Sequence, residues 1–236
     1  MEYFYVDHSD VHGNTLLIRG EEHKHLVRVL RKQAGDRVLV TDGNDAMFDA
    51  VIVGIERDGV RCEISNTMMR YNEPRIDVTL AISLLKNPSR FDVVVEKGTE
   101  LGVRRIIPMM CERTIPRHDK HDRFEKITLA AMKQCGRSYR PRIFPLTPFE
   151  EMALHAGEYP LRLIPHEKTE QSQFVGSVVR HHPEVKSVLV MIGPEGGFTD
   201  HEIETASRNK FIPISLGPRR LRSETAALTA LTHVMG

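Results

Sequence analysis

Two glycine-rich segments near the C-terminus contain residue types that could hold a ligand. The first, GPEGGF (193–198), follows the wholly apolar run 188–192, and the second, LGPRRLR (216–222), follows the largely apolar run 211–216. A short continuous apolar run is typical of a buried parallel strand. Each loop should therefore lie at the C-terminal end of a strand, where open α/β sheets bind ligands. We expect the two loops to border one shared crevice.

The composition of the loops narrows the choice of ligand. Neither loop has the GxxxxGK[ST] or GxGxxG pattern of phosphate-binding sites, and Glu195 would repel a closely held pyrophosphate. Backbone amides beside Gly193, Gly196 and Gly197 suit a flat group such as adenine or ribose, and a carboxylate suits a ligand with cationic character. S-adenosylmethionine combines adenosine with a sulfonium and an ammonium group. Two simple tight turns are the alternative, but the presence of both loops favours a ligand.

Strand and helix patterns alternate around these loops from residue 74 onward. A capping box, Thr199-Asp200-His201-Glu202, predicts a helix start directly after the first loop, and residues 223–225 begin another helix after the second. The segment 147–150, TPFE, has the same capping pattern with proline at the first helical position. Strand patterns occur at 77–85, 104–110, 142–146, 161–164, 187–192 and 211–216. The alternation predicts an α/β fold with a parallel sheet and helices on both faces.

The first 65 residues have a different, β-rich pattern. Strands are predicted at 3–6, 15–18, 37–41, 47–55 and 60–64, with one helix at 21–33. Leu26, Val29 and Leu30 form the apolar stripe of that helix, and basic residues occupy its other faces. These basic residues are either a solvated surface or a phosphate-contacting surface for nucleic acid. A polar stretch, 65–74, is the predicted linker to the second half.

Whole-chain composition excludes several classes of protein. The 236 residues carry a formal net charge of +1, which gives no global signal for a polyanion partner. The three cysteines have no CxxC spacing, which argues against a disulfide framework or structural zinc. Histidines and aspartates at 118–122 have metal-ligand types but lie in a polar loop, so no metal is expected. No signal peptide or bilayer-spanning run is present, and we expect a cytoplasmic protein.

Five segments together resemble one known family. They are GPEGGFTDHEI (193–203), LGPRRLRSETAALTA (216–230), EEHKHLVRVLRKQAGD (21–36), SLLKNPSRFDVVVEKGTELGVRRIIPMMCER (83–113) and AMKQCGR (131–137). The combination is similar to the SPOUT methyltransferases, specifically the RsmE type that methylates N3 of a uridine in 16S ribosomal RNA. The likeness extends over nearly the whole chain. Two positions depart from the family pattern: Arg220 replaces an apolar residue, and Lys133 replaces a glutamate.

The resemblance implies an architecture and partners. It implies a PUA-like RNA-binding β-barrel over 1–70 and an α/β SPOUT domain over 74–236, with a parallel sheet and a C-terminal trefoil knot. It also implies a homodimer that uses S-adenosyl-L-methionine and acts on 16S rRNA of the small ribosomal subunit. The implied cofactor-binding residues are Leu163, Pro165, His166, Gly193, Pro194, Glu195, Gly196, Gly197, Leu216, Gly217, Leu221, Arg222, Glu224, Thr225 and Ala226.

Methyl transfer from a sulfonium needs no metal, but the uracil imide must lose its proton. We expect Arg113, Arg137 and Arg222 to contact the RNA or to stabilise the developing negative charge. We expect Glu112 and Gln134 to handle the proton or to orient the base. The alternatives are that Glu112 and Arg113 form a surface ion pair and that Gln134 is a helix-capping or packing residue. Phosphate contacts are expected from Arg19, Arg28, Arg31, Arg90 and Arg140.

Two other functions stay open at this stage. One is a SPOUT methyltransferase that acts on tRNA or on a ribose 2′-hydroxyl. The other is a nucleotide-binding or RNA-binding module without catalysis. The N-terminal β-rich module joined to TELGV and GPEGG favours rRNA uridine-N3 methylation over the first of these.

Overall fold

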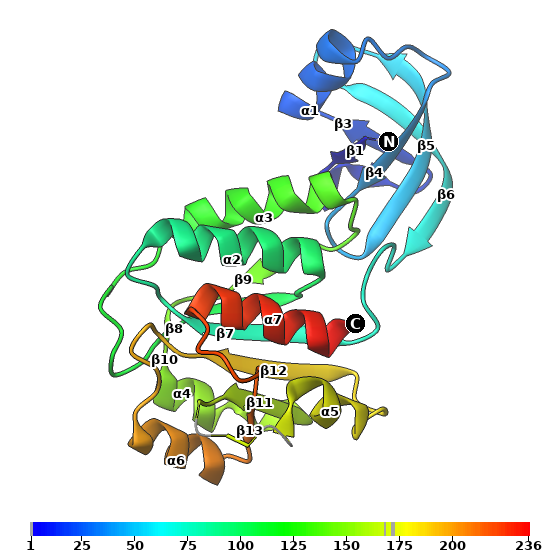
Figure 1. Ribbon diagram of the computed structural model, residues 1–236. Helices are drawn as coiled ribbons and strands as arrows, with labels where there is room; N and C mark the ends of the chain where they lie inside the picture. The colour runs from blue at the N-terminus through cyan, green and yellow to red at the C-terminus, as the bar shows by residue number, and fades with distance from the viewer. Residues whose placement is uncertain (1, 168, 171–172) are drawn as a thin grey trace. The chain divides into compact units, whose positions relative to one another are not determined.

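The structure is a computed structural model that describes residues 2–167, 169–170 and 173–236 (Figure 1). It divides into two compact units. Unit 1 comprises the chain up to Glu73 together with Leu129–Arg140, and unit 2 comprises Pro74–Thr128 and Pro141–Gly236. The division into a domain over 1–70 and a domain over 74–236 stays a prediction.

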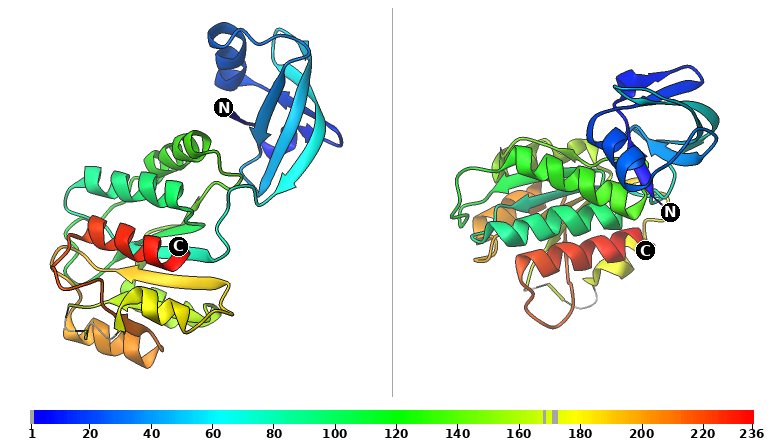
Figure 2. Two further views of the ribbon diagram at one scale, coloured as in Figure 1. Left: turned by 45° about the vertical axis from the view of Figure 1, so that its right-hand side comes forward. Right: turned by 90° about the horizontal axis from the view of Figure 1, so that it is seen from above.

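Unit 1 is built on a six-stranded sheet that curls into a half-barrel (Figure 2). The strand order is β1-β4-β5-β6-β3-β2, antiparallel except for the parallel pair β1 and β4. Alternate side chains face the hollow of the sheet, as period-two patterning requires, and Phe4, Leu16 and Val40 are among those that form its core. The strands are β1 (Tyr3–Tyr5), β2 (Val11–His12), β3 (Thr15–Ile18), β4 (Arg37–Thr41), β5 (Ala46–Ile55) and β6 (Val60–Met69).

The helix predicted over 21–33 is shorter and less regular than expected. An α-helix, α1 (Gly20–Lys24), continues as a π-helix, η2 (His25–Val29), in which the Leu30 amide donates to the His25 carbonyl five residues back. Because a π-turn holds more residues than an α-turn, its side chains do not keep the spacing of an α-helical face. The expected apolar stripe of Leu26, Val29 and Leu30 is therefore only partly correct. Leu26 is buried, whereas Val29 is 67% exposed. A short 3-10 turn, η1 (His8–Asp10), precedes β2.

A segment distant in sequence completes unit 1. Residues 136–140 follow the end of α3 and form hydrogen bonds with the β-rich part of the unit. Arg137 Nη2 lies 2.6 Å from Glu73 Oε2, and both side chains are almost fully buried. The Thr41 hydroxyl donates to the Ser138 carbonyl at 3.1 Å. A buried ion pair and these hydrogen bonds therefore join two separate stretches of the chain within one unit.

Unit 2 contains the predicted parallel sheet. Its order is β10-β8-β7-β12-β11-β13, with β9 also paired to β8, and every pairing is parallel. The predicted strands at 142–146 and 211–216 are shorter than expected. The strands are β7 (Asp77–Ser83), β8 (Arg105–Met110), β9 (Arg142–Ile143), β10 (Thr147–Pro148), β11 (Leu161–Pro165), β12 (Ser187–Ile192) and β13 (Ile212–Ile214).

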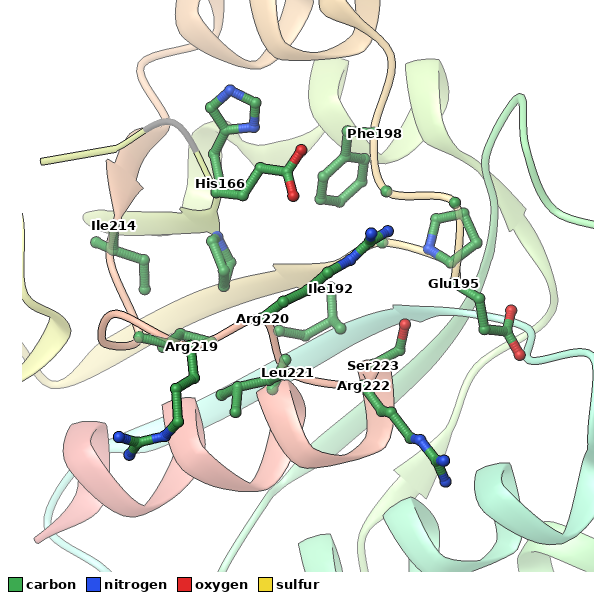
Figure 3. A pocket seen from close by; sticks show the side chains of 18 of the residues that line it. His166, Ile192, Glu195, Phe198, Ile214, Arg219, Arg220, Leu221, Arg222 and Ser223 are labelled. Atoms are coloured by element: carbon green, nitrogen blue, oxygen red, sulfur yellow. The ribbon is translucent and has the colours of Figure 1, made fainter.

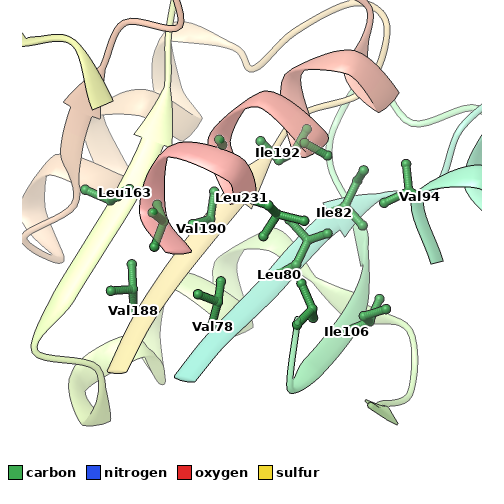
Figure 4. Close-up of a cluster of buried hydrophobic side chains, with 14 of the residues drawn as sticks. Val78, Leu80, Ile82, Val94, Ile106, Leu163, Val188, Val190, Ile192 and Leu231 are labelled. Atoms are coloured by element: carbon green, nitrogen blue, oxygen red, sulfur yellow. The ribbon is translucent and has the colours of Figure 1, made fainter. Parts of the chain in front are cut away.

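Helices cover both faces of this sheet, as predicted. On β12, Val188, Val190 and Ile192 face one hydrophobic cluster (Figure 4), whereas Leu189 and Met191 face another. The first cluster includes side chains of α2 (Pro88–Leu101), α5 (Val175–Arg180) and α7 (Ser223–Met235), and α2 and α7 lie side by side (Figures 1 and 2). The second includes α4 (Phe149–Leu154), η3 (Ala156–Glu158) and α6 (Asp200–Arg208). Helix α3 (His121–Cys135) contributes to both units.

The predicted helix starts have different outcomes. The capping box of α6 is confirmed, because the Thr199 hydroxyl accepts from the Glu202 amide and the Glu202 carboxylate accepts from the Thr199 amide. The box predicted at 147–150 is wrong. Helix α4 begins at Phe149 with Pro148 at the N-cap position, and the Thr147 hydroxyl donates to the Pro145 carbonyl instead.

Over the described part of the chain, every helix is too short or too polar to span a bilayer. The trefoil knot stays a prediction.

Candidate functional site

A pocket of about 560 Å³ opens at the C-terminal ends of β11, β12 and β13 (Figure 3). Residues 192–198 line one side, and residues 214–217 and 219–223 with Ala226 line another. The expected shared crevice of the two glycine-rich loops is therefore present. Its position follows from the parallel sheet, because the strands end at one edge and their loops converge there.

Glycines in the first loop allow close packing and a tight turn. A Cβ atom at Gly193 would approach the Phe198 ring to 3.2 Å, and one at Gly196 would approach Cδ of Arg113 to 3.1 Å. Gly197 instead has φ +70 and open space around it, and its amide donates to the Pro194 carbonyl at 2.9 Å. Gly193 and Gly196 therefore let neighbouring side chains approach, whereas Gly197 closes the turn.

Neighbouring strand ends hold the first loop in place. The Glu195 carboxylate accepts from the Lys86 amide at 2.9 Å, just after β7, and the Arg113 guanidinium donates to the Gly196 carbonyl at 2.7 Å. Glu195 therefore faces Lys86 rather than the middle of the pocket (Figure 3). One of its carboxylate oxygens thus accepts from the backbone, and the suitability of this carboxylate for a cationic ligand stays a prediction.

A buried carboxylate anchors the helix that follows this loop. Glu202 is 1% exposed, and its Oε1 accepts from the Glu112 amide at 2.9 Å while its Oε2 accepts from the Thr199 amide at 2.8 Å. One side chain thus ties the start of α6 to the segment after β8. That segment also contains Arg113, so the loop and the arginine that contacts it are positioned together.

The second loop leads into α7. Gly217 has φ +110, which a residue with a Cβ rarely adopts, and its amide donates to the Ser215 hydroxyl at 3.2 Å. Arg222 occupies the N-cap position of α7 without a side-chain capping bond. Ser223 is 6% exposed and lines the pocket (Figure 3), and within the described residues its hydroxyl has no hydrogen-bond partner.

Sequence comparisons match most of the chain to one family. The RNA methyltransferase domain matches residues 72–235, and the RNA methyltransferase PUA domain matches residues 18–65. A ribosomal RNA small subunit methyltransferase E from Synechocystis is 33% identical over 213 residues, which are 89% of this chain and 69% of that protein. The chain belongs to the RsmE family of RNA methyltransferases. The Bacillus subtilis member is 28% identical over 229 residues, covering 93% of this chain and 89% of that protein.

Solved structures of similar proteins share the fold. An RsmE-family structure from Neisseria gonorrhoeae, bound to S-adenosyl methionine, has a TM-score of 0.82 and 29% identity over 98% of this chain and 95% of that one. A putative methyltransferase from Legionella pneumophila, in complex with the same cofactor, has a TM-score of 0.79 and 30% identity over 98% and 96%. These likenesses confirm the predicted α/β domain with a PUA-like N-terminal sheet.

Most cofactor residues expected from the RsmE resemblance line the pocket. Three do not: Leu163 is fully buried in β11, and Glu224 and Thr225 lie in the first turn of α7. The expected residues that do line it are Pro165, His166, Gly193, Pro194, Glu195, Gly196, Gly197, Leu216, Gly217, Leu221, Arg222 and Ala226.

Sequence reasoning missed several lining residues. Ile192 and Ile214 are the last residues of their strands, and the strand ends were the signal that could have found them. The other missed lining residues are Phe198, Ser215, Arg219 and Arg220. Glu167 and Ser223 also line the pocket, as expected from the segments in which they lie.

The candidate catalytic residues of this RsmE-family chain have different environments. Arg113 and Arg222 line the pocket. Glu112 and Gln134 are exposed and, like the buried Arg137, are not among its lining residues. Arg137 is held by Glu73, as described above. The catalytic roles of all five stay predictions.

The arginines expected to contact RNA also lie in different environments. Arg90 lines the pocket, and its Nε lies 3.5 Å from Glu224 Oε1. In unit 1, Arg28 and Arg31 are exposed, and Arg19 is exposed and pairs with Asp10. Arg140 is half-buried. Lys133, one of the two departures from the family pattern, forms an ion pair with Glu22 within unit 1.

No group of His, Cys, Asp or Glu side chains suited to a metal ion occurs among the described residues.

Proposed function

We propose that this protein transfers a methyl group from S-adenosyl-L-methionine to N3 of a specific uridine in 16S rRNA of the small ribosomal subunit. The observation that carries the proposal is the single pocket formed by both glycine-rich loops at the sheet edge. Its support is the membership in the RsmE family and the similar structures that contain this cofactor.

The pocket residues fit such a cofactor. Ile192, Ile214 and Leu216 offer apolar contacts to a flat adenine, and the two loops offer backbone amides for hydrogen bonds. A Cβ at Gly197 or Gly217 would meet no atom within 4 Å, so both loops border open space. When bound, the cofactor supplies the methyl group and a good leaving group.

The chain itself has to orient the uracil and lower the cost of removing its imide proton. We assign this role to Arg113, because its guanidinium lines the pocket and donates to the Gly196 carbonyl. Arg222 approaches the pocket from the start of α7, where the positive end of the helix dipole adds to its charge. Both would stabilise the negative charge that develops on the base.

Mapping of methylated nucleosides tests the reaction. The protein is incubated with labelled S-adenosylmethionine and, separately, with naked 16S rRNA, small subunits or tRNA, and the RNA is digested and analysed by mass spectrometry. We expect 3-methyluridine from the ribosomal substrates alone. A 2′-O-methyl nucleoside, or modification of tRNA, would overturn the proposal, and absence of cofactor binding by calorimetry would indicate a non-catalytic module.

The homodimer expected from the resemblance is part of this proposal. Light scattering on the purified protein should give twice the 26.9 kDa mass of the chain. A monomeric mass at micromolar concentration would remove the dimer from the proposal without affecting the reaction.

A further inference from the structure

Five arginines line the pocket, and the structure separates them into two groups. Two are held by the protein: Arg90 by Glu224 at 3.5 Å, and Arg113 by the Gly196 carbonyl at 2.7 Å. The other three, Arg219, Arg220 and Arg222, are exposed. Within the described residues their guanidinium groups form no hydrogen bond or ion pair.

Fewer carboxylates than guanidinium groups surround the pocket. Glu224 pairs with Arg90, and Glu195 and Glu167 are the carboxylates among the lining residues. Both of these lining carboxylates are exposed. The second loop therefore presents more positive charge than the pocket neutralises.

That surplus does not suit the cofactor alone. S-adenosylmethionine carries a sulfonium, an ammonium and a carboxylate, so its net charge is positive, and three unpaired guanidinium groups would repel it overall. A polyanion would be attracted by the same groups. Guanidinium groups also match phosphate oxygens in geometry, because they can donate two parallel hydrogen bonds.

The arrangement of Arg219 and Arg220 indicates how such a polyanion would lie. They are adjacent in sequence but point away from one another (Figure 3). The positive φ of Gly217 turns the chain just before them, and both arginines are exposed residues of the pocket lining. Two diverging cations are better suited to successive phosphates of a strand than to one compact anion.

We propose that Arg219 and Arg220 form a phosphate-binding rim, which receives the RNA backbone beside the nucleotide whose base enters the pocket. The inference rests on the proposed function and adds to it the substrate contact made by the second loop. Arg220 stands where the family pattern has an apolar residue, so the phosphate contact that we assign to Arg220 is specific to this chain.

The test separates RNA binding from cofactor binding. The double variant Arg219→Ala/Arg220→Ala is compared with the wild type by calorimetry with S-adenosylmethionine alone, and by filter binding to a 16S rRNA fragment over a series of salt concentrations. We expect cofactor affinity to change less than twofold and RNA affinity at low salt to fall about tenfold or more. Loss of two phosphate contacts should also reduce the slope of log K against log salt by roughly 1.4.

A matched control removes the same charge elsewhere on unit 2. Arg180 on α5 and Arg208 on α6 are not among the pocket-lining residues, and Arg180→Ala/Arg208→Ala should retain the wild-type salt slope. The charge-conserving Arg219→Lys/Arg220→Lys should recover most of the slope. An unchanged slope in the alanine variant, or a loss of cofactor affinity without loss of RNA affinity, would overturn the rim.

The rim and the proposed function can fail separately. Wild-type methylation together with an unchanged slope in the alanine variant rejects the rim only. A reduced slope in a protein whose wild type yields no methylated uridine supports the rim and rejects the reaction.

Discussion

At the scale of single residues, the buried carboxylate of Glu202 in unit 2 serves as an acceptor for backbone amides. It satisfies amides from two segments while it is almost fully buried. We expect Glu202→Gln to lower the free energy of unfolding by roughly 1–3 kcal/mol, since the new amide group places a donor against an existing donor.

Urea denaturation measures the effect. Glu204→Gln is the control, because Glu204 lies on the same helix but is exposed and pairs with Arg208 at 3.4 Å. Its change should stay within about 0.5 kcal/mol. Equal effects of the two variants would contradict the anchoring role of Glu202.

The three cysteines should differ in reactivity. Burial raises the pKa of the Cys62 thiol to about 12 and also raises the pKa of Cys111, whereas Cys135 is only half-buried. In native protein at pH 8 we expect Ellman's reagent to modify Cys135 alone, and in guanidinium chloride all three. Cys135→Ser should abolish the native reaction, and rapid labelling of that variant would contradict the assignment.

The same pKa shift implies a pH dependence of stability. Because the folded pKa of Cys62 lies above the unfolded value of about 8.5, its protonated thiol contributes fully below that pH. The contribution is lost as pH rises toward about 12. Replacement by a small apolar residue, Cys62→Ala, should flatten the decline of unfolding free energy over this range, and an unchanged decline would contradict it.

Sequence reasoning located the ligand loops but not the directions of their side chains. The glycine spacing and flanking apolar runs were sufficient, because strand ends in a parallel sheet must share an edge. The direction of Glu195 was not predictable, since it depends on the position of the Lys86 amide, more than a hundred residues earlier. The start of α7 at Ser223, in contrast, was predicted from the sequence.

At the scale of elements, the loop between β13 and α7 depends on the backbone of Gly217. A Cβ there would meet no atom within 4 Å, so any effect of Gly217→Ala comes from its φ of +110 and not from a clash. We expect a loss of roughly 1–3 kcal/mol in the free energy of unfolding, together with weaker binding of S-adenosylmethionine as the loop shifts.

Gly157 provides a matched control, because a Cβ there also meets nothing within 4 Å but its φ is not positive. Gly157→Ala should leave cofactor affinity unchanged and can raise stability by up to about 1 kcal/mol. Thermal unfolding and calorimetry measure both variants. Equal results at the two positions would show that the backbone conformation of Gly217 is unimportant.

Elements were predicted well where one periodicity dominated. The continuous apolar run of β12 predicted a buried strand, and the capping box at Thr199 predicted the helix α6 that follows it. The helix at 21–33 was overestimated because propensity does not reveal a π-turn or the positive φ of Arg31 that ends the helix. The segment 147–150 has the sequence pattern of a capping box, but Pro148 occupies the N-cap position of α4 and no side-chain capping bond forms.

At the scale of the whole molecule, unit 1 consists of two pieces of chain. A fragment of residues 1–70 lacks Glu73 and the hydrogen bonds that residues 136–140 supply. We therefore expect the fragment to give poorly dispersed NMR amide signals, or to unfold well below the temperature at which the intact chain unfolds.

A fused control tests whether the missing segment is the cause. Residues 1–73 joined to 129–140 by a flexible Gly/Ser linker should recover dispersed signals, and Glu73→Gln in that fusion should reverse the gain because it leaves Arg137 buried without its charge partner. A stable, well-dispersed fragment 1–70 would instead support the sequence-based domain boundary.

The two-piece construction of unit 1 also sets an order of events during synthesis. The β-rich part leaves the ribosome first, yet it cannot bury Glu73 or bond Thr41 to its partner until residue 140 has emerged. Unit 1 therefore begins first, but it is completed only after residues 74–128 of unit 2 have been made. A chimera that takes its N-terminal unit from a relative must accordingly exchange both pieces, because a cut after residue 73 alone would separate the buried glutamate from its own arginine.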